Sequence, residues 1–171
     1  MYQEIILDHY REKHHSGLRD PFTAEVHHVN PSCGDELTLR VDVADETVRD
    51  VSYFGEGCSI SQASTSVMSD LVIGRSVADA LALYEEFRTM MDSGGQIEPN
   101  EDRLEDAIAF HGVSKFPVRV KCALLGWAAM RDALLRSGVH SNQAIATPAD
   151  GDGAEPTRTR VDSAGQGVSH E

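Results

Sequence analysis

The sequence lacks the features that mark membrane proteins, nucleic-acid-binding proteins and exported proteins. Its longest run of apolar residues and glycine, residues 122–130, has nine members, whereas a membrane-spanning helix needs about 20. The opening stretch, MYQEIILDHYREK, is charged and amphipathic and has no apolar segment typical of an export signal. With 15 lysines and arginines against 28 aspartates and glutamates, the net charge of −13 disfavours contact with phosphate backbones. We therefore expect a cytoplasmic protein that binds neither membranes nor nucleic acid.

Cysteine is also scarce, because the chain has only Cys33, Cys58 and Cys122. An odd number, wide spacing and the lack of an export signal argue against a disulfide framework. In a reducing cytosol these thiols are buried apolar groups, metal ligands or nucleophiles, and the function depends on which of these they are.

The last part of the chain differs in composition from the rest. Residues 141–171 contain no Leu, Phe, Met, Trp, Tyr or Cys. Such a segment cannot bury enough apolar surface to offset the conformational entropy lost on folding. We therefore predict one folded domain, residues 1–140, and a disordered acidic tail, residues 141–171.

Hydrophobic periodicity in residues 1–140 predicts an α+β domain. Apolar and polar residues alternate over 36–43, ELTLRVDV, which is typical of a half-buried strand. The runs 24–29 and 47–54 are plausible partners, and the short polar turn at 45–46 predicts a hairpin. A three-stranded antiparallel sheet packed with helices follows from this pattern. The expected helices cover residues 2–12, 60–73 (polar on one side and apolar on the other), 76–90, a short stretch around Leu104 and Ile108, and 117–136.

Cys33 lies in a turn-forming segment, NPSCGD, between two predicted strands. In an extended Cys-Gly-Asp, the side chains of Cys33 and Asp35 lie on the same side, and Gly34 lets the backbone bend to bring them together. A thiolate and a carboxylate could then share one cation. The alternative is that Asp35 only caps a turn.

Cys58 and Cys122 both lie near the start of a predicted helix. Unpaired backbone N–H groups at a helix start favour a thiolate over a thiol, and Arg119 and Lys121 beside Cys122 act in the same direction. The alternative is that Cys58 is a small buried apolar group and that Cys122 is a core residue packed under Trp127.

Together, three thiols and one carboxylate form an accepted tetrahedral ligand set for Zn²⁺, and thiolates also suit iron–sulfur clusters. The spacing matches no short zinc-finger pattern and does not choose between them. The eight histidines are competing ligands, but the pairs at 14–15 and 27–28 are more typical of a solvated surface. The acidic run 98–106 lacks the alternating ligands of a calcium loop, and we interpret it as a solvated face.

The cysteines fall in three segments: NPSCGD at 30–35, GEGCSISQAS at 55–64 and FPVRVKCALLGW at 116–127. In this order they resemble the IscU/NifU-N superfamily of iron–sulfur cluster assembly proteins, over residues 2–137. Scaffolds of the IscU type carry a histidine immediately before the third cysteine, where this chain has Lys121. That difference, with an extra stretch within residues 88–112, resembles the SufU branch, whose members bind zinc and relay sulfur.

The resemblance implies a site and partners. Zinc would be held by Cys33, Asp35, Cys58 and Cys122. Catalytic roles would fall to Cys33, as the sulfur acceptor, and to Arg119 beside it. A pyridoxal-phosphate cysteine desulfurase of the SufS type would supply persulfide sulfur, and a downstream iron–sulfur assembly scaffold would receive it. The chain would then be a zinc-dependent sulfurtransferase.

Two other hypotheses stay open. The same thiols could build an iron–sulfur cluster, which would make the chain a scaffold, or zinc could be purely structural in a binding module. Lys121 argues against the scaffold, because a protonated amine is a poor metal ligand.

Overall fold

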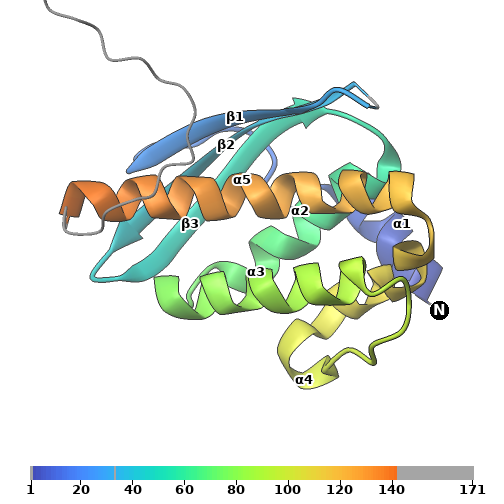
Figure 1. The fold of residues 1–171 in the computed structure, drawn as a ribbon. Coiled ribbons are helices and arrows are strands. Elements are labelled where there is room, and N and C mark those ends of the chain that lie inside the picture. Colours follow the sequence, from blue (N-terminus) through green and yellow to red (C-terminus); the bar gives the residue numbers. More distant parts are fainter. Residues whose placement is uncertain (1, 33, 142–171) are drawn as a thin grey trace, which may run out of the picture.

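The computed structural model describes residues 2–32 and 34–141, and it contains one three-stranded sheet with helices packed against it (Figure 1). The elements follow in the order α1 (Tyr2–Glu12), β1 (Ala24–Asn30), β2 (Asp35–Ala44), β3 (Thr47–Glu56), α2 (Ser59–Val72), α3 (Val77–Asp92), α4 (Glu101–Leu104), the 3₁₀-helix η1 (Glu105–Lys115) and α5 (Pro117–Ser141). This confirms the predicted three-stranded α+β architecture. Of the predicted tail, 141–171, residues 142–171 lie outside the described residues, and the domain limit at residue 140 stays a prediction.

The sheet is antiparallel throughout, with β2 in the centre. Asp45 and Glu46 form the predicted hairpin turn, and both have positive φ angles, 52° and 58°, as the tight turns that match strand twist require. Leu39 and Val41 of β2 are almost fully buried, so the alternating pattern does place one face of the strand against the core.

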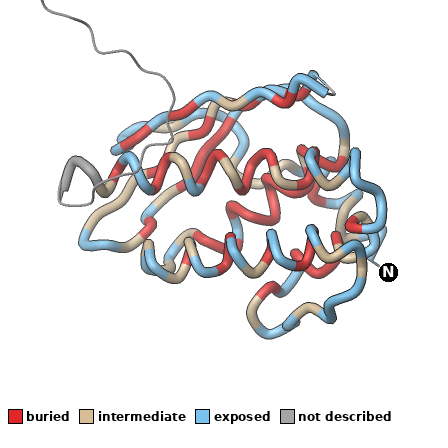
Figure 2. The backbone as a smooth tube through the Cα atoms, in the orientation of Figure 1, coloured by how far each residue is buried: buried red, intermediate tan, exposed pale blue. Residues whose placement is uncertain are grey.

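The helices form layers on one side of the sheet. Helix α5 lies along β1 and β2, and α2 packs between α5 and α1 (Figure 1). Buried residues follow the strands, α2 and the inner side of α5 (Figure 2). None of the helices in the described part of the chain is both long and apolar enough to cross a bilayer.

Helix α2 is buried on its polar side as well as on its apolar side, which the amphipathic pattern did not predict. Small hydroxyl residues line that side, and all are buried: Ser61, Ser64, Thr65, Ser66 and Ser69. Their hydroxyl groups are satisfied inside the protein, as buried polar groups must be. Thr65 donates to the carbonyl of Ser61 at 2.8 Å and Ser69 donates to that of Thr65 at 2.9 Å.

Contacts with α5 explain why these side chains are small. The Ser64 hydroxyl donates to the Ala123 carbonyl at 2.7 Å and accepts from the indole N–H of Trp127 at 3.1 Å. At Gly126, an added Cβ would overlap the hydroxyl of Thr65. The two helices therefore approach closely at the point where one has glycine and the other has a short polar side chain.

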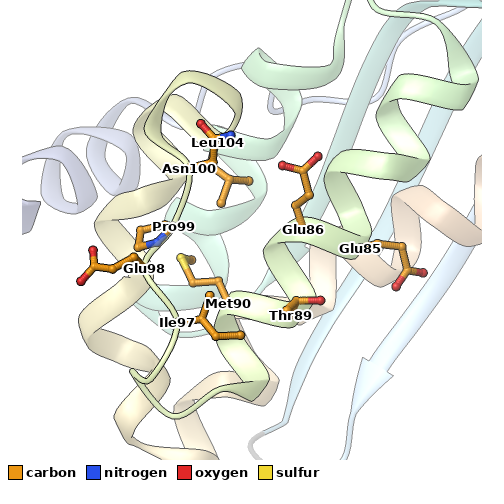
Figure 3. A pocket seen from close by; sticks show the side chains of 9 residues that line it. All are labelled: Glu85, Glu86, Thr89, Met90, Ile97, Glu98, Pro99, Asn100 and Leu104. Carbon is orange, nitrogen blue, oxygen red and sulfur yellow. The ribbon is translucent and has the colours of Figure 1, made fainter.

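The segment after α3 folds as a short α-helix and a longer 3₁₀-helix rather than as one short helix. Asn100 caps α4, because its side-chain oxygen accepts the N–H groups of Asp102 and Arg103. The acidic side chains of Glu98, Glu101 and Asp102 are exposed, as predicted. Between α3 and this segment lies a pocket of about 290 Å³ that has no cysteine or histidine in its lining (Figure 3).

Substituting Gly126→Ala should destabilise the protein, because the new methyl group overlaps Thr65 in a closely packed interface. The expected loss is about 1–3 kcal/mol in the free energy of unfolding, measured by urea denaturation. Gly138→Ala, in the same helix, is the matched control, because its Cβ would meet no other atom within 4 Å. It should be neutral or stabilising by up to about 1 kcal/mol. Equal losses in both variants would contradict the close-approach argument.

Candidate metal centre

Asp35 is held at the start of β2 by a tight connection from β1. Asn30 and Asp35 are paired across the two strands. The Asn30 carbonyl accepts the N–H of Gly34 at 2.8 Å, and its side-chain oxygen accepts the N–H of Ser32 at 3.1 Å. Gly34 has a φ of 75°, a conformation that glycine adopts without strain. Asp35 is 2% exposed, so this connection fixes a carboxylate beneath the protein surface.

Cys58 lies where β3 ends and α2 begins, and it is the N-cap residue of α2. Its backbone N–H donates to Asp35 Oδ1 at 3.1 Å. Its Sγ lies 3.9 Å from Asp35 Oδ2. The thiol is exposed, so the side chain that contacts the buried carboxylate is also open to a partner.

Gly57 allows this close approach. A Cβ at residue 57 would lie 2.8 Å from Asp35 Oδ1, closer than carbon and oxygen pack without a hydrogen bond. The glycine before Cys58 therefore leaves the space in which the carboxylate and the thiol meet.

Cys122 completes the group from the second turn of α5. It is 4% exposed, and its Sγ lies 3.8 Å from the carbonyl of Val118. One ligand atom each from Asp35, Cys58 and Cys122 lies within 4.8 Å of the other two. The structure thus brings together three predicted ligands that are far apart in the sequence.

The donor set fits zinc. Two thiol sulfurs and one carboxylate oxygen are ligands that Zn²⁺ prefers, and the space left by Gly57 lies beside them. Cys33, the predicted fourth ligand and sulfur acceptor, lies outside the described residues, so its role stays a prediction. Its neighbours Ser32 and Gly34 belong to the connection that leads into Asp35.

Arg119 lies one turn before Cys122 on α5, a spacing that puts both residues on one side of the helix. Its side chain is exposed, and among residues 2–32 and 34–141 it makes no ion pair. It borders a surface pocket of about 560 Å³, together with Tyr2, Ile60 and Phe116. Ile60 lies two residues after Cys58 in the sequence, but no cysteine in the described part of the chain lines this pocket.

In the described part of the chain, the side-chain hydrogen bonds and ion pairs of the histidine pairs at 27–28 and 14–15 are with residues other than Asp35, Cys58 and Cys122. His27 contacts Thr38 on the sheet, and His28 turns to the other face and contacts Asp132 of α5, as strand alternation predicts. His14 is only half exposed, and hydrogen bonds to the carboxylates of Glu12 and then Asp70 raise its pKa above the ordinary value.

The sequence of this chain also matches known proteins. A family model described as the NifU-like N terminal domain matches residues 1–123. The chain belongs to the NifU-like N terminal domain family. This confirms the resemblance seen in the three cysteine segments.

Two curated relatives within this family carry different names. The chain is 41% identical over 137 residues to the "Iron-sulfur cluster assembly scaffold protein IscU" of Streptococcus pyogenes, covering 80% of this chain and 84% of the relative. It is 37% identical over 137 residues to the "Zinc-dependent sulfurtransferase SufU" of Bacillus subtilis, covering 80% of this chain and 90% of the relative. The family is therefore settled by these matches, and the two names correspond to different activities.

A solved structure agrees with the fold. The crystal structure of a putative iron–sulfur cluster assembly scaffold protein for the SUF system from Fervidobacterium islandicum has a TM-score of 0.71 and 37% identity to this chain. The match covers 77% of this chain and 94% of that one.

Gly57→Ala should lower the zinc content of the purified protein, because the added methyl group takes the space beside Asp35 and Cys58. We expect zinc affinity to fall by about tenfold or more, as it does when groups that orient ligands are disturbed. The measurement is competition with a chromophoric chelator.

Gly112→Ala is the matched control, because a Cβ there would meet nothing within 4 Å. It should bind zinc as the unaltered protein does. If Gly57→Ala kept full zinc affinity while remaining folded, the metal would have to lie elsewhere.

Proposed function

We propose that this chain takes sulfur from the persulfide of a pyridoxal-phosphate cysteine desulfurase onto Cys33 and passes it to a downstream scaffold that builds iron–sulfur clusters. The observation that carries the proposal is the convergence of Asp35, Cys58 and Cys122 within 4.8 Å, next to the connection that contains residue 33. The likeness to the Bacillus subtilis zinc-dependent sulfurtransferase supports it.

The protein's residues would hold Zn²⁺ through Asp35, Cys58, Cys122 and Cys33. When bound, zinc supplies a positive charge that keeps coordinating thiols deprotonated at neutral pH. The Asp35 carboxylate is already hydrogen-bonded to the Cys58 N–H, so it would keep its position whichever of the thiols is bound to zinc.

The sulfur transfer is a thiol–disulfide type of exchange. The Cys33 thiolate attacks the terminal sulfur of the desulfurase persulfide, and a new S–S bond forms to Cys33. The original S–S bond breaks, and its electron pair leaves on the desulfurase cysteine as a thiolate. The proton stays with the transferred sulfur, so no oxidant or reductant is consumed.

The surface around Arg119, one turn before Cys122 on α5, has the properties that a docked donor segment needs. The pocket bordered by Arg119 and Phe116 is open, and Phe116 and Val118 are 59% and 66% exposed. Exposed apolar side chains of this size are typical of a protein-binding surface. Arg119 adds a fixed positive charge that would attract the Cys33 thiolate during the exchange.

A scaffold that assembles a cluster is the second candidate, because the Streptococcus pyogenes relative carries that name. Lys121 favours the relay. It is exposed, and a protonated amine offers no lone pair to iron at the place where scaffolds of this family carry histidine.

Cys33→Ala should abolish stimulation of the desulfurase. With unaltered protein, we expect cysteine turnover to rise and one added sulfur atom to appear on Cys33 by mass spectrometry. With Cys33→Ala, turnover should fall to the rate of the desulfurase alone, because the acceptor thiol is missing.

Ser32→Ala is the control for the same connection and should stimulate normally. Stimulation by Cys33→Ala equal to that of the unaltered protein would refute the relay. Purified protein that is brown, with iron and sulfide in place of zinc, would favour the scaffold instead.

Arg119→Ala should reduce stimulation of the desulfurase when this chain is present at a subsaturating concentration. It should leave the zinc content unchanged, because the Arg119 side chain binds no metal. Arg119→Lys, which keeps the charge, should restore part of the loss. Zinc loss in Arg119→Ala would show that the residue maintains the site instead of assisting transfer.

A further inference from the structure

A second group of potential metal ligands lies where the end of α1 and the following loop pack against α2. His9 is 6% exposed, and its Nδ1 lies 2.7 Å from the Ser66 hydroxyl. That contact engages Nδ1 and leaves Nε2, which lies 3.7 Å from Asp106 Oδ2. A metal-ligating histidine is usually oriented by a hydrogen bond at one ring nitrogen, which leaves the other nitrogen to bind the metal.

His14 and Asp70 lie beside this buried imidazole. The ring centres of His9 and His14 are 4.6 Å apart, and His14 Nδ1 lies 2.6 Å from Asp70 Oδ2. The loop that carries His14 is anchored, because its N–H donates to Ser66 at 2.9 Å and its carbonyl accepts from Tyr53 at 2.8 Å. The three side chains are thus held close together. Both ring nitrogens of His14 and both carboxylate oxygens of Asp70 have hydrogen-bond partners, so an ion would replace the contact between His14 and Asp70.

The separation of the ligand atoms suits a single ion. One ligand atom each from His9, His14 and Asp70 lies within 4.8 Å of the other two. In a tetrahedral zinc site with bonds of about 2.0–2.2 Å, two donors lie about 3.3–3.6 Å apart. Closing the set around one cation would require side-chain movements of up to about 1.5 Å, including a widening of the 2.6 Å contact between His14 Nδ1 and Asp70 Oδ2 if both atoms bind the ion.

The surroundings of these three side chains are negatively charged, and a pocket beside them leaves room for an ion. A pocket of about 100 Å³ is lined by His9, Asp70, Asp106 and Glu105, and Glu12 contacts the other ring nitrogen of His14 at 2.9 Å. This volume exceeds that of a few water molecules at about 30 Å³ each. An ion and the waters that complete its coordination therefore fit.

We propose that His9, His14 and Asp70 form a second cation site, for a divalent transition-metal ion such as Zn²⁺ or Co²⁺ that imidazole and carboxylate ligands suit. Asp106 and water complete the coordination. Cys58 precedes α2 and Asp70 lies near its other end, so the two sites are about 18 Å apart at 1.5 Å per residue. The second site is independent of sulfur transfer, and its ion would link α1 to α2.

Cobalt absorption tests the proposal on the full chain. The protein is first given one equivalent of Zn²⁺, which thiolates take up in preference, and is then titrated with Co²⁺. We expect visible d–d bands that saturate at one equivalent, without the near-ultraviolet sulfur-to-cobalt charge-transfer bands of a thiolate site. His14→Asn and Asp70→Asn should weaken this binding by about tenfold or more.

His27→Asn is the matched control. His27 is exposed and lies 3.3 Å from a carboxylate, that of Glu36, but among residues 2–32 and 34–141 it belongs to no group of three potential ligands. It should bind cobalt like the unaltered protein, and far-ultraviolet circular dichroism checks that all variants are folded.

The outcomes separate this proposal from the proposed function. Absence of d–d bands beyond the first equivalent, or unchanged cobalt affinity in both His14→Asn and Asp70→Asn, would overturn the second site. Charge-transfer bands would show instead that zinc had not filled the thiol site. The titration is then repeated with Cys58→Ser/Cys122→Ser, in which the d–d bands must persist for the second site to stand.

Discussion

The hydrogen bond from the Cys58 N–H to the Asp35 carboxylate is the contact on which the site depends. It joins the start of β2 to the start of α2 across a separation that only the folded sheet can close. A carboxylate that is 2% exposed would be costly without such a partner, because burial of an ion is unfavourable unless it is hydrogen-bonded. Gly57 makes the contact sterically possible. Around this bond, α5 needs only to bring Cys122 alongside for the three ligand atoms to converge.

Helix α2 sets the positions of both ligand groups, and its small polar side chains make this possible. Ser64 fixes the position of α2 against α5 through its hydrogen bonds with Ala123 and Trp127. Ser66, two residues on, instead contacts His9 and the N–H of His14. Helix α2 therefore determines the positions of both groups of potential ligands, the one with the thiols and the one with the histidines. Its contacts are too short to tolerate larger side chains.

The sequence was sufficient to predict the strands, their pairing and most helices, because period-two alternation and helical periodicity are local. At the start of α3, Ser76 is the N-cap residue and its side chain accepts the Asp79 N–H at 3.0 Å. Asp35, Cys58 and Cys122 could be proposed as a group only because one cation can use all three, and by family resemblance. Spacing could not place them together, since their convergence depends on packing between elements distant in sequence.

The features that the sequence did not reveal are also long-range. Nothing in the pattern of 60–73 distinguishes a helix with a solvated polar side from one whose serines are buried inside the protein, because both have the same periodicity. His9 and Asp70 were missed because 61 positions separate them in the sequence. A histidine such as His9, next to an aspartate in an amphipathic helix, gives no local signal of burial.

The packing of Trp127 gives the molecule a built-in optical reporter. The chain has one tryptophan, which is fully buried, stacks on Phe87 with ring centres 4.3 Å apart and donates to Ser64. Trp127 lies on α5 just beyond Cys122 and contacts α2, the helix that Cys58 caps, so its emission reports on the interface between α2 and α5. Any rearrangement of that interface, on metal loss or on docking, would be visible as a change in fluorescence without an added label.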